Sequence, residues 1–286
     1  LKTAAAQSSL ILVHDADGDT GLYIHLAHQL SGDRTVYGIR PLAQPGVPMV
    51  HSRIPDMAAH YIAELRHQQP HGPYLLGGLC AGGVLAAEMA LQLEAAGETV
   101  ALTALLEAPD VAAEERVSLS QQRLSRLSDQ LASLSLAQRL TTVATKAVNV
   151  VRYEASQRFL QAKRVLQIRA LRLWQDQQPA NNKPAPGFAK GLSVRSLYLF
   201  AEGSYSPKAQ LQGRVVLIKA TKGSGEPGDQ AYCECYQDDD FGWRNRLARP
   251  LEIHQVVGGH FTMLRPDYAA AIARILDQSI ETALTT

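Results

Sequence analysis

The chain has 286 residues, of which 46% are hydrophobic, enough to form one large domain or a core with a sizeable insertion. Its 28 Lys and Arg against 27 Asp and Glu leave a net charge of +1, which argues against nucleic acid or an anionic membrane as a partner. No apolar run approaches the roughly 18 residues that a membrane helix needs, and residues 1–9 lack the pattern of a signal peptide. The 3 cysteines do not make a disulfide framework, so we expect a soluble, cytoplasmic chain.

Short apolar runs alternate with helical patterns through the first third of the chain. The apolar runs, each typical of a buried strand, are 10–13, 36–39, 74–79 and 100–106. The helical patterns between them are 22–30, 54–69 and 83–96, and Gly97 follows the last one where a left-handed cap is expected. Continuously apolar strands separated by helices predict an α/β fold, in which helices cover both faces of a mostly parallel sheet.

The middle of the chain has a different composition. Residues 111–178 are rich in Gln, Ser, Leu, Arg and Ala, and their leucines recur at helical spacing. The segment 179–186 contains three prolines, which end helices and stiffen connections. We therefore predict a helical lid insertion over 111–187, within a core made of 1–110 and 188–286.

Strand and helix patterns return after the insertion. The segment 194–200 fits a strand or a helix equally well, whereas 215–218 and 252–257 are typical of strands. A closing helix over 266–283 is predicted from its helical pattern and from proline in its first turn. Apart from the insertion, the order of elements is typical of the α/β class.

A glycine-rich turn at 77–83 joins the third predicted strand to an Ala-rich helix. Within it, Gly78, Cys80 and Gly82 have the spacing of a nucleophile elbow, with cysteine in the usual serine position. Glycines are needed there because the turn is tight and larger side chains would collide with the strand or helix. The sulfur lies at a helix N-terminus, whose partial positive charge stabilises an anion. We predict that Cys80 is the catalytic nucleophile; the alternative is a buried, inert cysteine.

A single histidine follows the last predicted strand. His260 comes directly after Gly258 and Gly259, in a loop that precedes the closing helix. A general base must reach the proton of the nucleophile, and the end of a parallel strand near the turn is a suitable place for one. Because the chain has 9 histidines, position rather than residue type favours His260 as the base.

Two carboxylates are candidates for orienting this imidazole. Glu107 ends the fourth predicted strand, so it should point into the same crevice as Cys80, and we favour it. Asp229 lies after the next-to-last strand, the more usual place for such an acid, and is the second choice. For the oxyanion hole, we expect the backbone N–H of Ala81 and a second N–H from the loop after the first strand, at Ala16.

Other motifs predict no bound metal or cofactor. The acidic loop from Asp15 resembles the start of a calcium-binding loop, but its sixth position is Thr20 and its twelfth is Leu26, which does not fit. Cys233 and Cys235 supply only two thiols, whereas a structural zinc site needs four ligands.

Together these motifs resemble the thioesterase domains that end nonribosomal peptide and polyketide synthases. The matching segments, spread over nearly the whole chain, are 10–18, 77–83, 105–109, 213–217 and 258–264. The resemblance implies an α/β-hydrolase with a helical lid after the strand that bears the acid, which supports Glu107 over Asp229. It also implies a carrier domain as partner, whose phosphopantetheine arm presents the substrate as a thioester, and acyl transfer to Cys80 and then to water or an internal nucleophile.

This sequence departs from the family pattern at two positions. The family usually has serine at position 80 and aspartate at position 107, where this chain has Cys80 and Glu107. Acyl transfer from one thiol to another keeps the acyl group activated, which suits closure of a strained ring such as a β-lactone or β-lactam. Two alternatives are a free-standing editing thioesterase that clears misloaded carrier domains, which Ala81 and the long insertion disfavour, and an inactive docking module.

Overall fold

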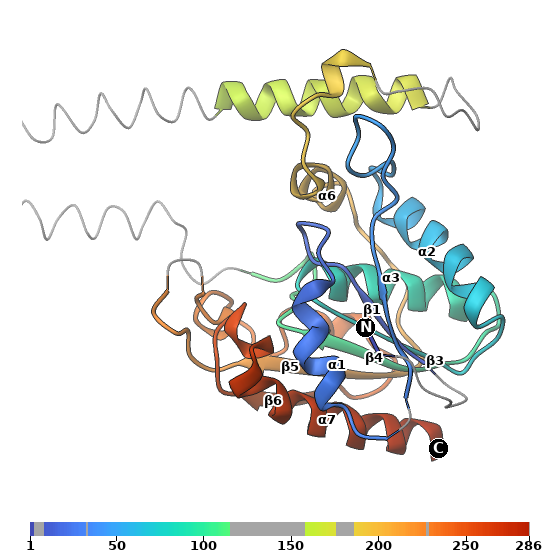
Figure 1. Ribbon diagram of the computed structural model, residues 1–286, viewed down its shortest axis with the longest axis vertical. Helices are drawn as coiled ribbons and strands as arrows, with labels where there is room; N and C mark the ends of the chain where they lie inside the picture. The colour runs from blue at the N-terminus through green and yellow to red at the C-terminus, as the bar shows by residue number, and fades with distance from the viewer. Residues whose placement is uncertain (3–8, 33, 115–157, 176–185, 227–228, 286) are drawn as a thin grey trace, which may run out of the picture.

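The computed structural model describes the chain except for residues 3–8, 33, 115–157, 176–185, 227–228 and 286. Within the described part, six strands form one sheet in the order β2-β1-β3-β4-β5-β6, and every neighbouring pair is parallel (Figure 1). The strands are β1 (Leu10–Val13), β2 (Val36–Ile39), β3 (Tyr74–Leu79), β4 (Val100–Leu106), β5 (Arg214–Ala220) and β6 (Glu252–Val256). The predicted parallel sheet is therefore confirmed.

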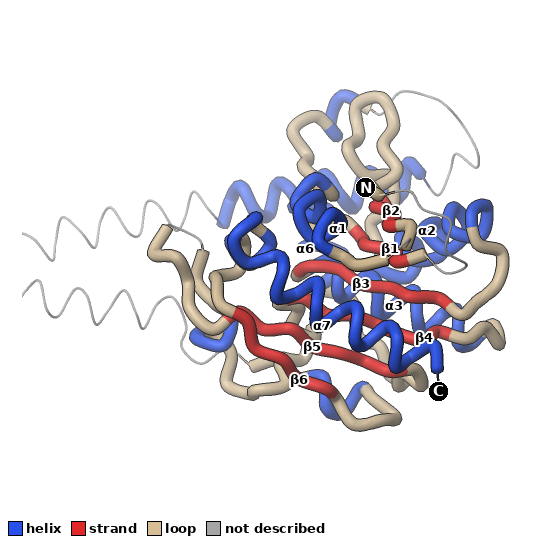
Figure 2. The backbone as a smooth tube through the Cα atoms, turned by 60° about the horizontal axis from the view of Figure 1, so that its bottom comes forward, coloured by secondary structure: helices blue, strands red, loops and turns tan. Residues whose placement is uncertain are grey.

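Helices cover both faces of this sheet. Those that the structure describes are α1 (Ile24–Gln29), α2 (Ile54–Gln68), α3 (Ala81–Ala95), α6 (Val194–Glu202), α7 (Pro266–Thr285) and a helix over 158–175. Figure 2 shows α7 crossing one face of the sheet, where it packs against α1, whereas α2 and α3 pack together on the other face. In the described part, none of the helices has the combined length and apolar character needed to cross a bilayer.

The burial of β1 shows why these strands are continuously apolar. Leu10 and Leu12 belong to the hydrophobic core on the α1 and α7 side, whereas Ile11 and Val13 belong to the core on the α2 and α3 side. Successive side chains of a strand point to opposite faces, and here both faces are covered. All four residues are fully buried as a result.

The segment whose pattern fitted either a strand or a helix is the helix α6. Ser193 caps its first turn by accepting a hydrogen bond from the Ser196 backbone N–H at 3.2 Å. Leu197, Tyr198 and Ala201 are its buried residues, which lie on one face at helical spacing.

Part of the predicted insertion is described. The helix over 158–175 agrees with the helical pattern there, and it lies with α6 away from the sheet (Figure 1). Residues 115–157 and 176–185 of the predicted lid fall outside the described part, so the boundaries of 111–187 stay a prediction. Gly97 follows α3 with φ of +80°, the left-handed conformation that was predicted.

The strand order identifies the edge of the sheet where a site is expected. The chain passes from β1 to β2 on one side and then returns to place β3 on the other side of β1. In open parallel sheets, ligands bind outside the carboxyl ends of the strands at such a reversal. Cys80 directly follows β3, and Glu107 directly follows β4. The topology therefore brings the sequence candidates to one edge of the sheet.

A substitution at Gly82 tests the close approach of α3 to β1. A Cβ at position 82 would lie 2.4 Å from the Val13 carbonyl oxygen and 2.8 Å from the His14 carbonyl oxygen. We expect Gly82→Ala to lower the free energy of unfolding by about 1–3 kcal/mol, because backbone on both sides must shift. Denaturant titration measures this change. Gly187→Ala is the control, since a Cβ there meets no atom within 4 Å, and equal stability of the two variants would contradict this packing.

Candidate active site

Cys80 occupies a strained turn between β3 and α3. Its backbone has φ of 52° and ψ of −117°, and its N–H donates to the Leu106 carbonyl at 2.9 Å. A side chain on Gly78 would place its Cβ 2.3 Å from the Gly82 carbonyl carbon, so the turn closes only with glycine at position 78. The structure thus has the tight turn that the glycine spacing predicted, and it leaves Cys80 partly exposed.

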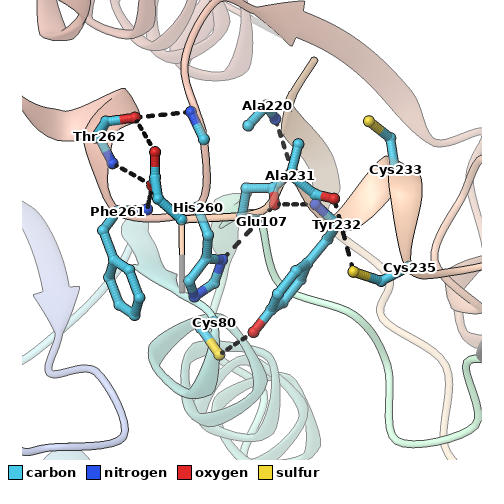
Figure 3. A network of polar contacts seen from close by, with 12 residues as sticks. Cys80, Glu107, Ala220, Ala231, Tyr232, Cys233, Cys235, His260, Phe261 and Thr262 are labelled. Atoms are coloured by element: carbon cyan, nitrogen blue, oxygen red, sulfur yellow. Dashed lines mark hydrogen bonds and ion pairs between the residues drawn. The ribbon is translucent and has the colours of Figure 1, made fainter. Parts of the chain in front are cut away.

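His260 reaches this sulfur from the loop after β6. The imidazole is buried, and Cys80 is close enough to it to raise its pKa. On its other side, Nδ1 lies 3.7 Å from Oε2 of Glu107. Within the described residues, Nδ1 has no closer hydrogen-bond partner. Figure 3 shows the three side chains in sequence, with the imidazole between the sulfur and the carboxylate.

Charge and hydrogen bonding around His260 favour its protonated form. Burial, the largest single influence, lowers the pKa of the imidazole. The negative charges and polar side chains of Cys80 and Glu107 outweigh that effect and raise the pKa from 6.5 to about 9. An imidazolium held next to Cys80 would stabilise negative charge that develops on the sulfur.

Glu107, which follows the end of β4, is held in place by two backbone N–H groups from other segments. It is completely buried and has a left-handed backbone with φ of 43°. Its Oε1 accepts from the Ala220 N–H at 2.6 Å, and its Oε2 accepts from the Tyr232 N–H at 2.8 Å. Two such donors stabilise a carboxylate that is out of contact with water. Of the two acids weighed from the sequence, Glu107 is the one that faces the imidazole.

Asp229 instead binds the backbone of the loop that carries His260. Its Oδ1 accepts from the N–H groups of Phe261 at 2.8 Å and Thr262 at 3.0 Å, and its Oδ2 accepts from the Thr262 hydroxyl at 2.7 Å. Oδ2 also accepts from the Ser224 N–H at 3.0 Å. Burial raises the pKa of Asp229, but the hydrogen bonds from Ser224 and Thr262 together hold that pKa well below its ordinary value. Asp229 therefore positions the histidine loop.

The two backbone groups expected to bind an oxyanion lie at the ends of neighbouring strands. Ala81 begins α3, and Ala16 lies in the loop after β1, which pairs with β3. Within the described residues, neither N–H has a hydrogen-bond acceptor. The Ala16 loop is held by Asp15, whose Oδ1 accepts from the Asp17 N–H at 2.9 Å, and by an ion pair between Asp17 and Arg195 of α6.

Two further residues have their roles decided by the structure. Tyr232, which sequence reasoning missed, lies with its hydroxyl 3.5 Å from the Cys80 sulfur (Figure 3). It belongs to an irregular segment after β5, where no periodicity marks it. His14 is fully buried and bonded to the Tyr61 hydroxyl at 2.7 Å. Burial lowers the pKa of His14 to about 4, so it is a neutral structural residue.

The remaining cysteines make no metal centre in the described part of the chain. Cys233 contacts the Thr221 carbonyl at 3.7 Å, and Cys235 contacts the Ala231 carbonyl at 3.8 Å. Among the described residues, no group of three or more His, Cys, Asp or Glu side chains could hold a metal ion.

Comparison with known proteins shows which family model and which relatives the chain resembles. The family model described as Thioesterase domain matches residues 8–280. Atromentin synthetase invA5 of Paxillus involutus is 33% identical over 110 residues, 38% of this chain and 11% of that protein. Malpinin synthetase of Mortierella alpina is 35% identical over 109 residues, 38% of this chain and 1% of that protein. The chain thus spans a small part of these curated relatives.

Solved structures share the fold at low sequence identity. The NocB thioesterase domain, in covalent complex with a fluorophosphonate nocardicin G analogue, has a TM-score of 0.58 and 21% identity, over 99% of this chain and 96% of that chain. The RedJ thioesterase of Streptomyces coelicolor has a TM-score of 0.57 and 13% identity, over 96% of this chain and 91% of that chain. A four-domain nonribosomal peptide synthetase, holo-AB3403, has a TM-score of 0.58 and 21% identity, over 97% of this chain and 20% of that chain. The predicted α/β-hydrolase fold is confirmed.

The role of Asp229 can be separated from that of Glu107 by measuring stability against pH. Asp229→Asn replaces one acceptor oxygen by a donor, so we expect a loss of about 1–3 kcal/mol in the free energy of unfolding at pH 7. Because the folded pKa of Asp229 lies below its ordinary 3.8, the stabilisation is complete above about pH 4 and fades as pH falls further. Urea unfolding between pH 7 and pH 3 should show the stability difference between the two proteins begin to shrink below about pH 4.

The control for this measurement is Asp238→Asn, a change at an exposed carboxylate of the neighbouring segment. We expect it to alter stability little at any pH. A stability difference between wild type and Asp229→Asn that stays constant down to pH 3 would contradict the role given to Asp229.

Proposed function

We propose that this chain, which belongs to the thioesterase domain family, releases an acyl chain from the phosphopantetheine thioester of a carrier domain through an acyl-Cys80 intermediate. The observation that carries the proposal is the polar chain Cys80, His260 and Glu107 at the carboxyl edge of the sheet. In this proposal Cys80 is the nucleophile, His260 is the general base and acid, and Glu107 orients and stabilises the imidazolium.

The first half-reaction loads the enzyme. His260 takes the Cys80 proton, and the thiolate attacks the thioester carbonyl carbon. The negative charge that develops on the carbonyl oxygen is received by the N–H groups of Ala81 and Ala16, which are otherwise without acceptors in the described part. When the intermediate collapses, the pantetheine sulfur leaves and takes a proton from the His260 imidazolium.

The second half-reaction releases the product. His260, now neutral, takes a proton from water or from a nucleophile within the acyl chain, and that nucleophile attacks the acyl-Cys80 carbonyl. Collapse expels the Cys80 sulfur, which is reprotonated from the imidazolium. Water gives a linear acid, and an internal nucleophile gives a ring.

Cysteine at position 80 favours ring closure over simple hydrolysis. Loading an acyl group from one thiol onto another retains the thioester, whereas loading onto serine would give a less activated oxoester. The retained activation can drive formation of a strained product. We therefore propose cyclisation, with a β-lactone or β-lactam as the strained-ring case, as the release step to test first.

A carrier domain is the proposed source of the acyl group. The curated relatives are synthetases that this chain matches over a small share of their length, and one structural neighbour is a four-domain nonribosomal peptide synthetase. Both facts support a covalently delivered substrate.

Substitution of Cys80 tests the covalent intermediate. Cys80→Ala should abolish acyl-enzyme formation, because no nucleophile remains, whereas Cys80→Ser should still load and shift the product ratio toward the linear acid. Mass spectrometry of the protein and of the released product, after incubation with a synthetic acyl-pantetheine thioester, measures both. Cys233→Ala is the matched control and should load like wild type. A wild-type protein that neither loads nor turns over would support the inactive docking module instead.

The pH dependence of deacylation tests His260 and Glu107. Acylation removes the negative charge on Cys80, which is one cause of the raised His260 pKa, so the deacylation rate should rise with pH around a midpoint below 9. Glu107→Gln removes the other negative partner, and we expect it to lower both the plateau rate and this midpoint, the midpoint by about one pH unit. Single-turnover decay of a preformed acyl-enzyme gives the profile. An unchanged midpoint in Glu107→Gln would remove Glu107 from the mechanism.

A further inference from the structure

One residue contacts every member of the proposed triad. The Tyr232 hydroxyl lies 3.5 Å from the Cys80 sulfur, and its ring stacks on the His260 imidazole with centroids 4.1 Å apart and planes 19° apart. Its backbone N–H donates to Glu107 Oε2 at 2.8 Å. Figure 3 shows the phenol ring alongside the imidazole, with the hydroxyl directed at the sulfur.

The surroundings of Tyr232 fix the direction of its hydroxyl. The residue begins a short 3₁₀ turn, Tyr232–Glu234, which follows β5. The phenol ring also makes edge contacts with Tyr236 at 5.4 Å and Phe241 at 6.5 Å between centroids. A ring that contacts three other aromatic side chains has little freedom to rotate its hydroxyl away from the sulfur.

The Tyr232 hydroxyl keeps its proton in this position. Burial raises the pKa of Tyr232, and the negative charge of the neighbouring Cys80 raises it further. At neutral pH the group is therefore a hydrogen-bond donor and cannot compete with His260 as a base. Toward a thiolate, which has no proton of its own, it can only donate.

We propose that Tyr232 is a fourth catalytic residue. Its hydroxyl donates a hydrogen bond to the Cys80 sulfur whenever that sulfur carries negative charge, and its ring keeps the His260 imidazole stacked against it. This inference rests on the proposed role of Cys80 as nucleophile. The effect of this donor should differ between the two half-reactions, because the sulfur is an anion when it attacks and again as it leaves during deacylation, but is a weak acceptor within the thioester.

That difference predicts an unequal effect on the two steps. A donor to the free thiolate raises the fraction of enzyme that is charged but also lowers the reactivity of the sulfur, so its effects on acylation partly cancel. During deacylation the donor stabilises only the developing charge on the departing sulfur. Loss of the hydroxyl should therefore slow deacylation more than acylation.

Other ionisable groups lie near the sulfur, and the test must hold them constant. Besides His260, the charge of Cys80 raises the pKa of Tyr23, Tyr198 and Arg195. The neighbouring Tyr236 raises the pKa of Tyr232. Tyr232→Phe leaves all of them in place and removes a single oxygen atom.

The experiment compares Tyr232→Phe with the matched variant Tyr236→Phe, which removes the same atom from the neighbouring ring. The first measurement is the pH profile of Cys80 alkylation by iodoacetamide in the free enzyme, with a Cys233→Ala, Cys235→Ala background so that one thiol reacts. We expect the midpoint of Tyr232→Phe to rise by about half a pH unit to one unit, the size of one lost hydrogen bond to a charged acceptor. Tyr236→Phe should keep the wild-type midpoint.

The second measurement is the pre-steady-state time course with an acyl-pantetheine thioester. Tyr232→Phe should slow deacylation about tenfold and acylation by less than threefold, so that acyl-enzyme accumulates, whereas Tyr232→Leu, which also removes the stacked ring, should slow both steps. Circular dichroism checks that each variant is folded. A purely structural role would slow both steps equally in Tyr232→Phe and leave the alkylation midpoint unchanged, and that result would overturn the proposal.

The two measurements also separate this inference from the proposed function. If wild type turned over no thioester, the release activity would fail, but the alkylation profiles would still decide whether the Tyr232 hydroxyl stabilises the sulfur anion. If wild type turned over and the Tyr232→Phe profiles matched it, only the inference would fail.

Discussion

The site is arranged around a sulfur that its own backbone holds in a strained conformation. Cys80 has a positive φ, which an ordinary side chain adopts only when its surroundings impose it. Here the surroundings are the close approach of Gly78 to Gly82 and of Gly82 to the Val13 carbonyl, each of which leaves no room for a Cβ. Because α3 is packed against β1, β3 and β4, the turn cannot relax without moving a helix. The packing of the core thus keeps Cys80 at the edge of the sheet.

Two buried carboxylates divide the support of His260 between them. Glu107 faces the imidazole and is itself fixed by two backbone N–H groups, from Ala220 and Tyr232. Asp229 instead accepts hydrogen bonds from the backbone N–H groups of the loop that carries His260. Both carboxylates support the same histidine, but only Glu107 lies beside its ring, where an acid can orient an imidazolium. Geometry, not residue type, separates an orienting acid from a positioning one.

The exchange of serine for cysteine changes what the same geometry can do. An imidazolium beside Cys80, favoured by an imidazole pKa of about 9, stabilises negative charge on the sulfur, and a thiol gives up its proton more readily than a serine hydroxyl. In the proposed mechanism the acyl group then stays activated on the enzyme. The aromatic side of the site, Tyr232 stacked on His260, supplies a donor suited to that anion. Sulfur, imidazole and phenol therefore form one electrostatic unit.

Sequence patterns predicted those features of the protein that depend on burial or on local backbone geometry. Continuous apolar runs separated by helical patterns report burial on both faces, so they predicted the parallel sheet, and the spacing of Gly78, Cys80 and Gly82 predicted the turn because only glycine permits those contacts. Residues 194–202 form a helix rather than a strand because Ser193 caps the first turn and one helical face is buried. The choice between Glu107 and Asp229, and the presence of Tyr232 beside the sulfur, were decided only by tertiary structure. Those residues lie in irregular segments far apart in the chain, where contacts depend on the path of loops across the sheet edge and leave no periodic trace.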